Sequence, residues 1–187
     1  MRTEHIALVR VSVLAGLVWA VDQGVKAWVR TNIPLFGAIY PIPQFAGFFR
    51  LTHLTNSGVA FGLLQGVAIV DLLVIGVLIA AVVFYLRHMP WQYRSVQVAA
   101  GMQLGGALGN ITDRLVRGSV TDYIDFFVRI GGREVHYPPF NLADTAIVGG
   151  IFLLLWALRR DPQPAQPSPA ETPWTDTSPE QWPAEHP

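Results

Sequence analysis

The chain has 187 residues, of which 51% are hydrophobic and 14% charged, and this apolar balance predicts a membrane protein rather than a soluble domain. Its formal net charge of zero argues against nucleic acid as a partner, because nucleic-acid binding needs a basic face. It has no cysteine, which excludes disulfides, thiolate metal ligands and a cysteine nucleophile.

Four segments are predicted to cross a membrane, since a helix needs about 20 mostly apolar residues to span the bilayer core. They cover residues 6–25, 63–86, 95–112 and 141–158. The first continues into "DQGVK" without a clear small-residue cleavage site, so we interpret it as retained rather than as a signal peptide. Residues 161–187 hold eight of the fourteen prolines and are predicted to be a disordered tail, which leaves 1–160 as the helical domain.

An even number of crossings places both termini on one side of the membrane. The ends of the first and third helices and the starts of the second and fourth then lie together on the other side. Six Lys and Arg residues fall on one face and seven on the other, so charge bias does not decide the orientation. Polar residues from separate stretches are predicted to share one layer: Asp22, Lys26, Asn56, Asn110, Asp113, Arg114, Asp122, Asn141 and Asp144. Ionisable groups are costly in a membrane and usually face an interior cavity, so this convergence predicts a functional site.

The end of the first helix carries Asp22 and Lys26, four residues apart and therefore on one helix face. They are predicted to form a structural ion pair at the membrane boundary, with the Lys26 side chain extending toward the interface. Further on, "LTNSGVAFG" combines Asn56 with the flexible residue Gly58. This stretch fits a substrate contact by Asn56 and an ordinary turn into the second helix equally well.

Small residues recur every four positions in the third helix, at Gly101, Gly105 and Gly109. Such spacing predicts close packing against a neighbouring helix in a bilayer. Asp113 continues the same stripe. Together with Asn110 and Arg114, it is predicted to form a charge network that holds the following loop.

The stretch "SVTDYIDFF" (119–127) alternates and is rich in β-branched and aromatic residues, which predicts a short strand. Asp122 and Asp125 would then point to opposite faces, so at most one of them faces the site. "RIGGRE" (129–134) is typical of a hairpin turn.

The fourth helix begins within "YPPFNLADTAIV" (137–148), where Asn141 and Asp144 share a face. Asp144 lies in the first turn, and the helix dipole favours its anionic form there by roughly 0.3–1 kcal/mol. A simple capping carboxylate is the alternative interpretation. His53 and His136 lack metal-ligand spacing and are interpreted as surface or loop residues, and Asp71 in the second helix is unexplained.

No GxSxG, Walker or HExxH motif is present, whereas carboxylates meet across the helices. Two acids that share a site cannot both ionise easily, so one stays protonated while the other activates water. This arrangement is typical of aspartic hydrolases. A proton- or cation-coupled transporter and a non-catalytic membrane binding protein are the rival classes, but all the site acids except Asp71 cluster toward one face, which favours the hydrolase.

Five motifs, taken in chain order, resemble those of the bacterial lipoprotein signal peptidases, the signal peptidase II family: "DQGVK", "TNSGVAFG", "GGALGNITDR", "VTDYIDF" and "FNLADTAI". The resemblance implies an all-α membrane protein with four transmembrane helices, a small extracytoplasmic β-rich cradle and an amphipathic helix. The cradle and the amphipathic helix are implied between the first and second helices, and the aromatic-rich segment 35–55 suits these parts. The resemblance also implies a multi-pass protein of the bacterial cytoplasmic (inner) membrane, with cytoplasmic termini and an active site near the outer face.

The activity implied by the resemblance is an aspartyl endopeptidase that cuts diacylglyceryl-modified prolipoproteins just before the lipid-bearing cysteine. The motifs assign the catalytic pair to Asp122 and Asp144. Separately, the position of Asp144 at the start of a helix predicts that it is the more anionic of the two. The residues expected to shape or support the site are Asn56, Gly58, Asn110, Asp113, Arg114 and Asn141, and those expected to be structural are Asp22 and Lys26. We expect no metal or other cofactor, a monomer, and membrane phospholipid and lipidated prolipoproteins as partners.

Overall fold

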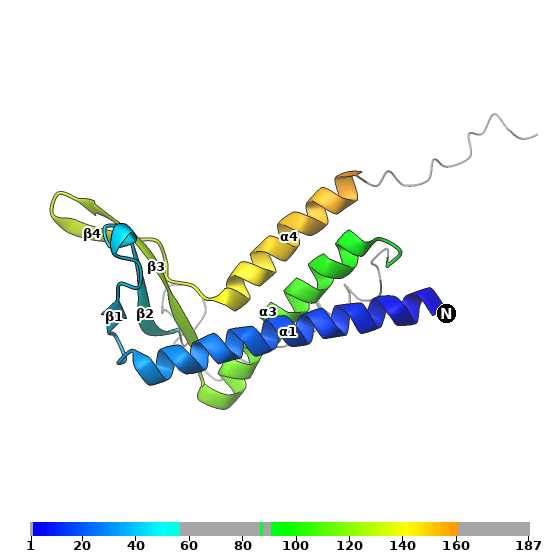
Figure 1. Cartoon of the computed structure of the whole chain (residues 1–187), viewed down its shortest axis with the longest axis horizontal. Helices are drawn as coiled ribbons and strands as arrows, with labels where there is room; N and C mark the ends of the chain where they lie inside the picture. Colours follow the sequence, from blue (N-terminus) through cyan, green and yellow to red (C-terminus); the bar gives the residue numbers. More distant parts are fainter. Residues whose placement is uncertain (1, 57–86, 88–90, 161–187) are drawn as a thin grey trace, which may run out of the picture.

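The computed structural model describes residues 2–56, 87 and 91–160. Three long helices form a bundle with a small sheet at one end, and the start of α1 and the end of α4 lie away from that sheet (Figure 1). The predicted second helix over 63–86, Gly58, Asp71 and the tail lie outside the described residues.

The helices are α1 (Arg2–Asn32), α3 (Arg94–Arg117) and α4 (Leu142–Arg160). They confirm the predicted segments 6–25, 95–112 and 141–158 and extend beyond most of their predicted ends. The first helix continues past residue 25 because its polar residues are paired inside the molecule and do not end the helix. α3 ends at Gly118, whose φ of 72° is a left-handed conformation typical of a glycine after a helix.

Within the part of the chain that the structure describes, two helices are long and apolar enough to span a membrane. They are His5–Asn32, with a mean hydropathy of 1.6, and Leu142–Arg160, with a mean hydropathy of 1.7. Large apolar side chains on their outer faces are exposed, among them Leu17 and Phe152. α3 has 24 residues but is not among these two spans, so the described residues do not confirm four crossings.

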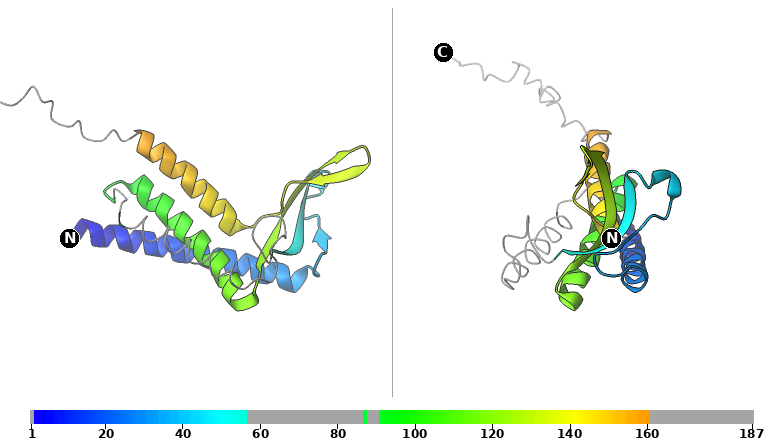
Figure 2. Two further views of the ribbon diagram at one scale, coloured as in Figure 1. Left: turned by 180° about the vertical axis from the view of Figure 1, so that it is seen from behind. Right: turned by 90° about the vertical axis from the view of Figure 1, so that its left-hand side faces the viewer.

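The sheet is antiparallel, in the order β1 (Ala38–Ile39), β2 (Phe49–Asn56), β3 (Val120–Ile130) and β4 (Arg133–His136). It confirms the predicted strand over 119–127. The predicted hairpin is also confirmed, because Gly131 and Gly132 adopt positive φ values of 58° and 79° between β3 and β4. Figure 2 shows the sheet from two further directions.

Residues 35–55 form no amphipathic helix, and the remainder of the stretch between the first two predicted helices lies outside the described residues. Residues 35–55 instead contain β1, the three-residue 3₁₀ helix η1 (Pro43–Phe45) and most of β2. Proline at 41 and 43 explains the difference, because a proline disfavours helical geometry in the residue before it and lacks the N–H that a continuing helix needs.

A hydrophobic cluster joins the sheet to the end of α1. Val29 of α1 and Ile33, the residue directly after α1, pack with Tyr123 of β3, and each is at most 4% exposed. The Tyr123 hydroxyl also accepts a hydrogen bond of 3.1 Å from the backbone N–H of Leu142, at the start of α4. Tyr123 therefore ties β3 to two helices directly beside Asp122.

The glycines of α3 let the helices approach closely, as predicted. A Cβ at Gly105 would lie 2.6 Å from Cβ of Val18 on α1, and one at Gly109 would lie 2.5 Å from the Asp22 carboxylate. On another face of α3, a Cβ at Gly106 would collide with the carbonyl oxygen of Ala143 on α4. α3 therefore packs against both α1 and α4.

Candidate active site

Asp122 lies on β3 and is 5% exposed. Its Oδ1 accepts a hydrogen bond of 2.8 Å from Nδ2 of Asn141, and its Oδ2 accepts one of 3.2 Å from Nδ2 of Asn56. Burial raises the pKa of Asp122 from 3.8 to about 6, and the Asp144 carboxylate adds to the rise while the two amides oppose it. Asp122 therefore keeps its proton at pH values where an exposed aspartate has lost it.

Asn56 reaches this carboxylate along the β2–β3 ladder. Leu54 lies opposite Asp122, and Asn56 lies opposite Val120. The register of the two strands shifts between Leu51 and Leu54, an irregularity of the kind that often re-aims side chains beside active sites.

Asp144 lies in the first turn of α4 and is half-buried. Nδ2 of Asn110 donates to its Oδ1 at 2.7 Å, and the backbone N–H of Asn141 donates to its Oδ2 at 3.2 Å. The Asp144 N–H in turn donates to Oδ1 of Asn141 at 3.0 Å. This reciprocal pair has the form of a capping box, so the predicted capping carboxylate is present.

Asn141 contacts both acids, although they come from different elements. Its side-chain NH₂ binds Asp122, while its backbone N–H and its side-chain oxygen bind Asp144. The Asn141 side chain is fully buried. One residue therefore links the two carboxylates, each through its own hydrogen bonds.

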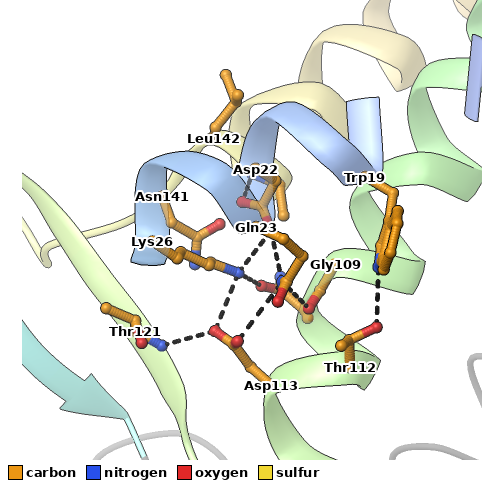
Figure 3. A network of polar contacts seen from close by, with 12 residues as sticks. Trp19, Asp22, Gln23, Lys26, Gly109, Thr112, Asp113, Thr121, Asn141 and Leu142 are labelled. Atoms are coloured by element: carbon orange, nitrogen blue, oxygen red, sulfur yellow. Dashed lines mark hydrogen bonds and ion pairs between the residues drawn. The ribbon is translucent and has the colours of Figure 1, made fainter. Parts of the chain in front are cut away.

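Lys26 is the centre of a buried charge network with Asp22 and Asp113 (Figure 3). Its Nζ lies 2.9 Å from Oδ2 of Asp22 and 3.2 Å from Oδ2 of Asp113. It also donates to Oδ1 of Asn110 at 3.0 Å. The Lys26, Asp22 and Asp113 side chains are all 0% exposed, so the prediction that Lys26 extends toward the membrane boundary is wrong, since its three acceptors lie inside the protein.

The network also holds the backbone next to each acid. Oδ1 of Asp22 accepts from the N–H of Ala143 at 3.0 Å, one residue before Asp144. Oδ2 of Asp113 accepts from the N–H of Thr121 at 3.1 Å, one residue before Asp122. Asp22 and Asp113 thus position the two segments that carry the acids.

In the part of the chain that the structure describes, Arg114 forms no ion pair with Asp113, and its guanidinium contacts the backbone carbonyl of Asn110, at 3.4 Å, within its own helix. Asp113 pairs instead with Arg117, at 3.0 Å, and more distantly with Arg30, at 3.7 Å. Adjacent helix residues face different directions whereas residues four apart share a face, so the spacing from 113 to 117 was the signal that sequence reasoning missed.

Asp125 faces the other side of β3, as the strand alternation predicted. Its carboxylate binds Nε of Arg50 at 2.7 Å and Nδ1 of His136 at 2.9 Å. His53 is only 9% exposed, and its Nδ1 lies 2.9 Å from the carbonyl oxygen of Ile33, so its interpretation as a surface or loop residue is wrong. Both histidines lie on strands and take part in local contacts.

A cavity of about 400 Å³ opens beside Asp144. The lining residues are Tyr137, Phe140, Asp144, Thr145, Val148, Gly149 and Phe152. Most of this wall is apolar, so an apolar group can lie directly next to the carboxylate. Among the described residues, no group of three or more His, Asp or Glu side chains is placed to hold a metal ion.

Comparisons with known proteins identify the family to which the chain is similar. The family model described as signal peptidase (SPase) II matches residues 14–160. The lipoprotein signal peptidase of Moorella thermoacetica is 40% identical over 149 residues, covering 78% of this chain and 89% of the relative. That of Pelotomaculum thermopropionicum is 40% identical over 150 residues, covering 80% and 91%.

Two solved structures, both titled as bacterial membrane enzymes, have a similar fold. One matches with a TM-score of 0.66 at 29% identity, covering 83% of this chain and 90% of that structure. The other matches with a TM-score of 0.65 at 30% identity, covering 80% and 92%. The residues 14–160 matched by the family model include both aspartates of the candidate site, the sheet and most of the three helices. The chain therefore belongs to the signal peptidase II family.

Proposed function

We propose that this chain is an aspartic endopeptidase that removes signal peptides from diacylglyceryl-modified prolipoproteins by cutting just before the lipid-bearing cysteine. Membership of the signal peptidase II family supports removal of signal peptides from prolipoproteins. The observation that carries the aspartic chemistry is Asn141, which binds the carboxylates of Asp122 and Asp144 at once.

In the proposed reaction, Asp144 is ionised and Asp122 is protonated. The Asp144 carboxylate takes a proton from water, and the water oxygen attacks the carbonyl carbon of the scissile peptide. The Asp122 carboxylic acid donates to the carbonyl oxygen as negative charge develops there. The C–N bond then breaks, Asp144 passes its proton to the leaving amine, and the proton of Asp122 returns to its carboxylate.

The surroundings of Asp144 support an apolar substrate. The cavity beside it offers a largely apolar wall, which suits the hydrophobic part of a signal peptide or an acyl chain. We propose that the protein works as a monomer among membrane phospholipids, whose acyl chains would cover the exposed apolar side chains of α1 and α4.

The proposed topology has four membrane crossings, with both termini in the cytoplasm and the site near the outer face of the inner membrane. The start of α1 and the end of α4 lie at the end of the bundle away from the sheet, which supports placing both on the same side of the membrane (Figure 1). Asp122 and Asp144 lie at the sheet end, where β3 meets the start of α4.

The test is cleavage of a lipid-modified precursor peptide by the purified protein in detergent. We expect the wild-type protein to release the signal peptide, and Asp122→Asn and Asp144→Asn each to lose essentially all cleavage while remaining folded. Asp125→Asn is the matched control, because Asp125 is a buried aspartate on the same strand that faces away from the site.

Retained cleavage in either Asp122→Asn or Asp144→Asn would contradict the proposed pair. Equal loss in Asp125→Asn, measured on folded protein, would show that any buried aspartate of this strand is needed and would remove the argument for a specific dyad. Absence of cleavage by the wild-type protein would overturn the proposed function itself.

A further inference from the structure

Asn110 stands between the buried charge network and the candidate dyad. Its Oδ1 accepts from Nζ of Lys26 at 3.0 Å, and its Nδ2 donates to Oδ1 of Asp144 at 2.7 Å. Asn110 is 7% exposed and Lys26 is fully buried. Lys26 therefore reaches Asp144 through a single amide side chain.

The two ends of an asparagine amide are nearly equal in shape, so its neighbours decide which end faces which. A lysine ammonium has only donors, and the atom of Asn110 nearest to Lys26 must therefore be the oxygen. The NH₂ end then faces Asp144. An NH₂ group has no acceptor on it, and a carboxylate that accepts such a bond is favoured in its ionised form.

We propose that Lys26 is a positioning residue for the hydrolysis: by donating to Asn110 it turns the amide so that its NH₂ faces Asp144, and it thereby holds Asp144 as the ionised acid of the pair. This inference rests on the proposed function and adds to it a reason for the division of roles between the two acids. Lys26 itself touches neither Asp122 nor Asp144 in the described contacts.

The charged and titratable groups around Asp144 come from several elements. In the described part of the chain they include Asp22 and Lys26 of α1, Asp113 of α3, and Asp122 and Tyr123 of β3, and Tyr137 lines the cavity beside Asp144. Asp22 and Asp113 both pair with Lys26, so Asn110 is the route by which this network donates a side-chain hydrogen bond to Asp144.

The experiment is a double-mutant cycle of Lys26→Met and Asn110→Ala, measured with a lipid-modified precursor peptide. Each single variant should lower kcat by about tenfold to a hundredfold, the size expected for losing a hydrogen bond to a charged group, with KM nearly unchanged. The double variant should be no slower than Asn110→Ala alone, because Lys26 acts through Asn110.

The pH profile separates positioning from a merely structural role. In both single variants the acidic limb of kcat/KM should move to higher pH by the same amount, because a carboxylate that loses a donor is protonated more easily. A structural role would lower the yield of folded protein and leave that limb in place. Arg117→Gln is the matched control, since it removes an ion pair to Asp113 of the same network without touching the Asn110 amide, and its profile should match the wild type.

Additive losses of kcat in the double variant, or an acidic limb that does not move in Lys26→Met, would overturn the positioning role. If Lys26→Met alone does not fold, the charge-balanced variant Lys26→Met/Asp22→Asn is measured against Asp22→Asn, with the same expected shift of the limb. Failure of the wild-type protein to cleave would instead overturn the proposed function, so the two failures are distinguishable.

Discussion

Asp144 combines two tasks at the scale of a single residue. It completes the capping box at the start of α4 through its contacts with Asn141, and it lies beside Asp122 in the candidate dyad. The capping interpretation and the dyad interpretation are therefore compatible. A helix start also suits an ionised carboxylate, because the helix dipole stabilises negative charge there.

The pKa of Asp122 leads to a prediction about pH. The proposed reaction needs a proton on Asp122, and burial raises the pKa of Asp122 to about 6. That proton is present below pH 6 and is lost as the pH rises through that value, so kcat/KM for a lipid-modified precursor should fall there. The pH dependence of initial rates checks this.

Asp125→Asn provides the control for this profile. Asp125 faces Arg50 and His136 on the other side of β3, so its loss should lower the thermal stability of the sheet and leave the same alkaline limb in kcat/KM. A rate that rises through about pH 6 would exclude Asp122 as the group that must hold a proton.

At the scale of elements, the position of α3 between α1 and α4 decides where the site forms. Gly105 and Gly109 let α1 approach, and Gly106 lets the start of α4 approach. This close packing brings Lys26 within reach of Asn110, and Asn110 within reach of Asp144. Larger residues on α3 would separate the elements that the site joins.

Gly106→Ala tests this packing. The added methyl group would collide with the carbonyl oxygen of Ala143 and lie 2.9 Å from Cγ1 of Ile147, so we expect a loss of roughly 1–3 kcal/mol in stability. Thermal unfolding in detergent measures it, and cleavage should fall as well, because Ala143 adjoins Asp144.

Gly16→Ala is the comparison for Gly106→Ala. No described atom lies within 4 Å of a Cβ at Gly16 on α1, so this change should leave stability equal or raise it by roughly 0.5–1 kcal/mol. A Gly106→Ala variant as stable as Gly16→Ala would show that the helices do not approach as closely as described.

For the whole molecule, the proposed topology puts the sheet on one side of the membrane and the start of α1 and the end of α4 on the other. The chain has no cysteine, so a single introduced cysteine reports its own position. Arg133 lies at the exposed β3–β4 hairpin, and Arg159 lies at the exposed end of α4. We expect a membrane-impermeant maleimide added to cells with a permeabilised outer envelope to label Arg133→Cys and to leave Arg159→Cys unlabelled.

Lysis of the inner membrane before labelling should expose both cysteines, which controls for their reactivity. Labelling of Arg159→Cys in unlysed cells, with Arg133→Cys protected, would contradict the proposed orientation and indicate the opposite one. Labelling of both would place the two ends on one side and contradict the crossing proposed for α4.

Several features of the fold and the site were predictable because they depend on local periodicity. Strand alternation separated Asp122 from Asp125, and the four-residue glycine spacing in the third helix predicted close packing on a neighbour. The polar residues at the ends of the predicted helices indicated that they lie in one layer near a single membrane face. Segment 35–55 forms no amphipathic helix for an equally local reason, because Pro41 and Pro43 disfavour a continuing helix there.

From the sequence alone, motif spacing and helix parity predict which residues share one layer as the candidate site. Which groups these side chains bind follows from the tertiary structure. Lys26 binds Asn110, 84 positions away along the chain. Among the described residues, Asp113 forms ion pairs with Lys26 and Arg117 rather than with the adjacent Arg114. The physical reason is that a buried charge binds the groups that packing brings within hydrogen-bond distance, and that distance depends on how α1, α3 and α4 meet rather than on spacing along the chain.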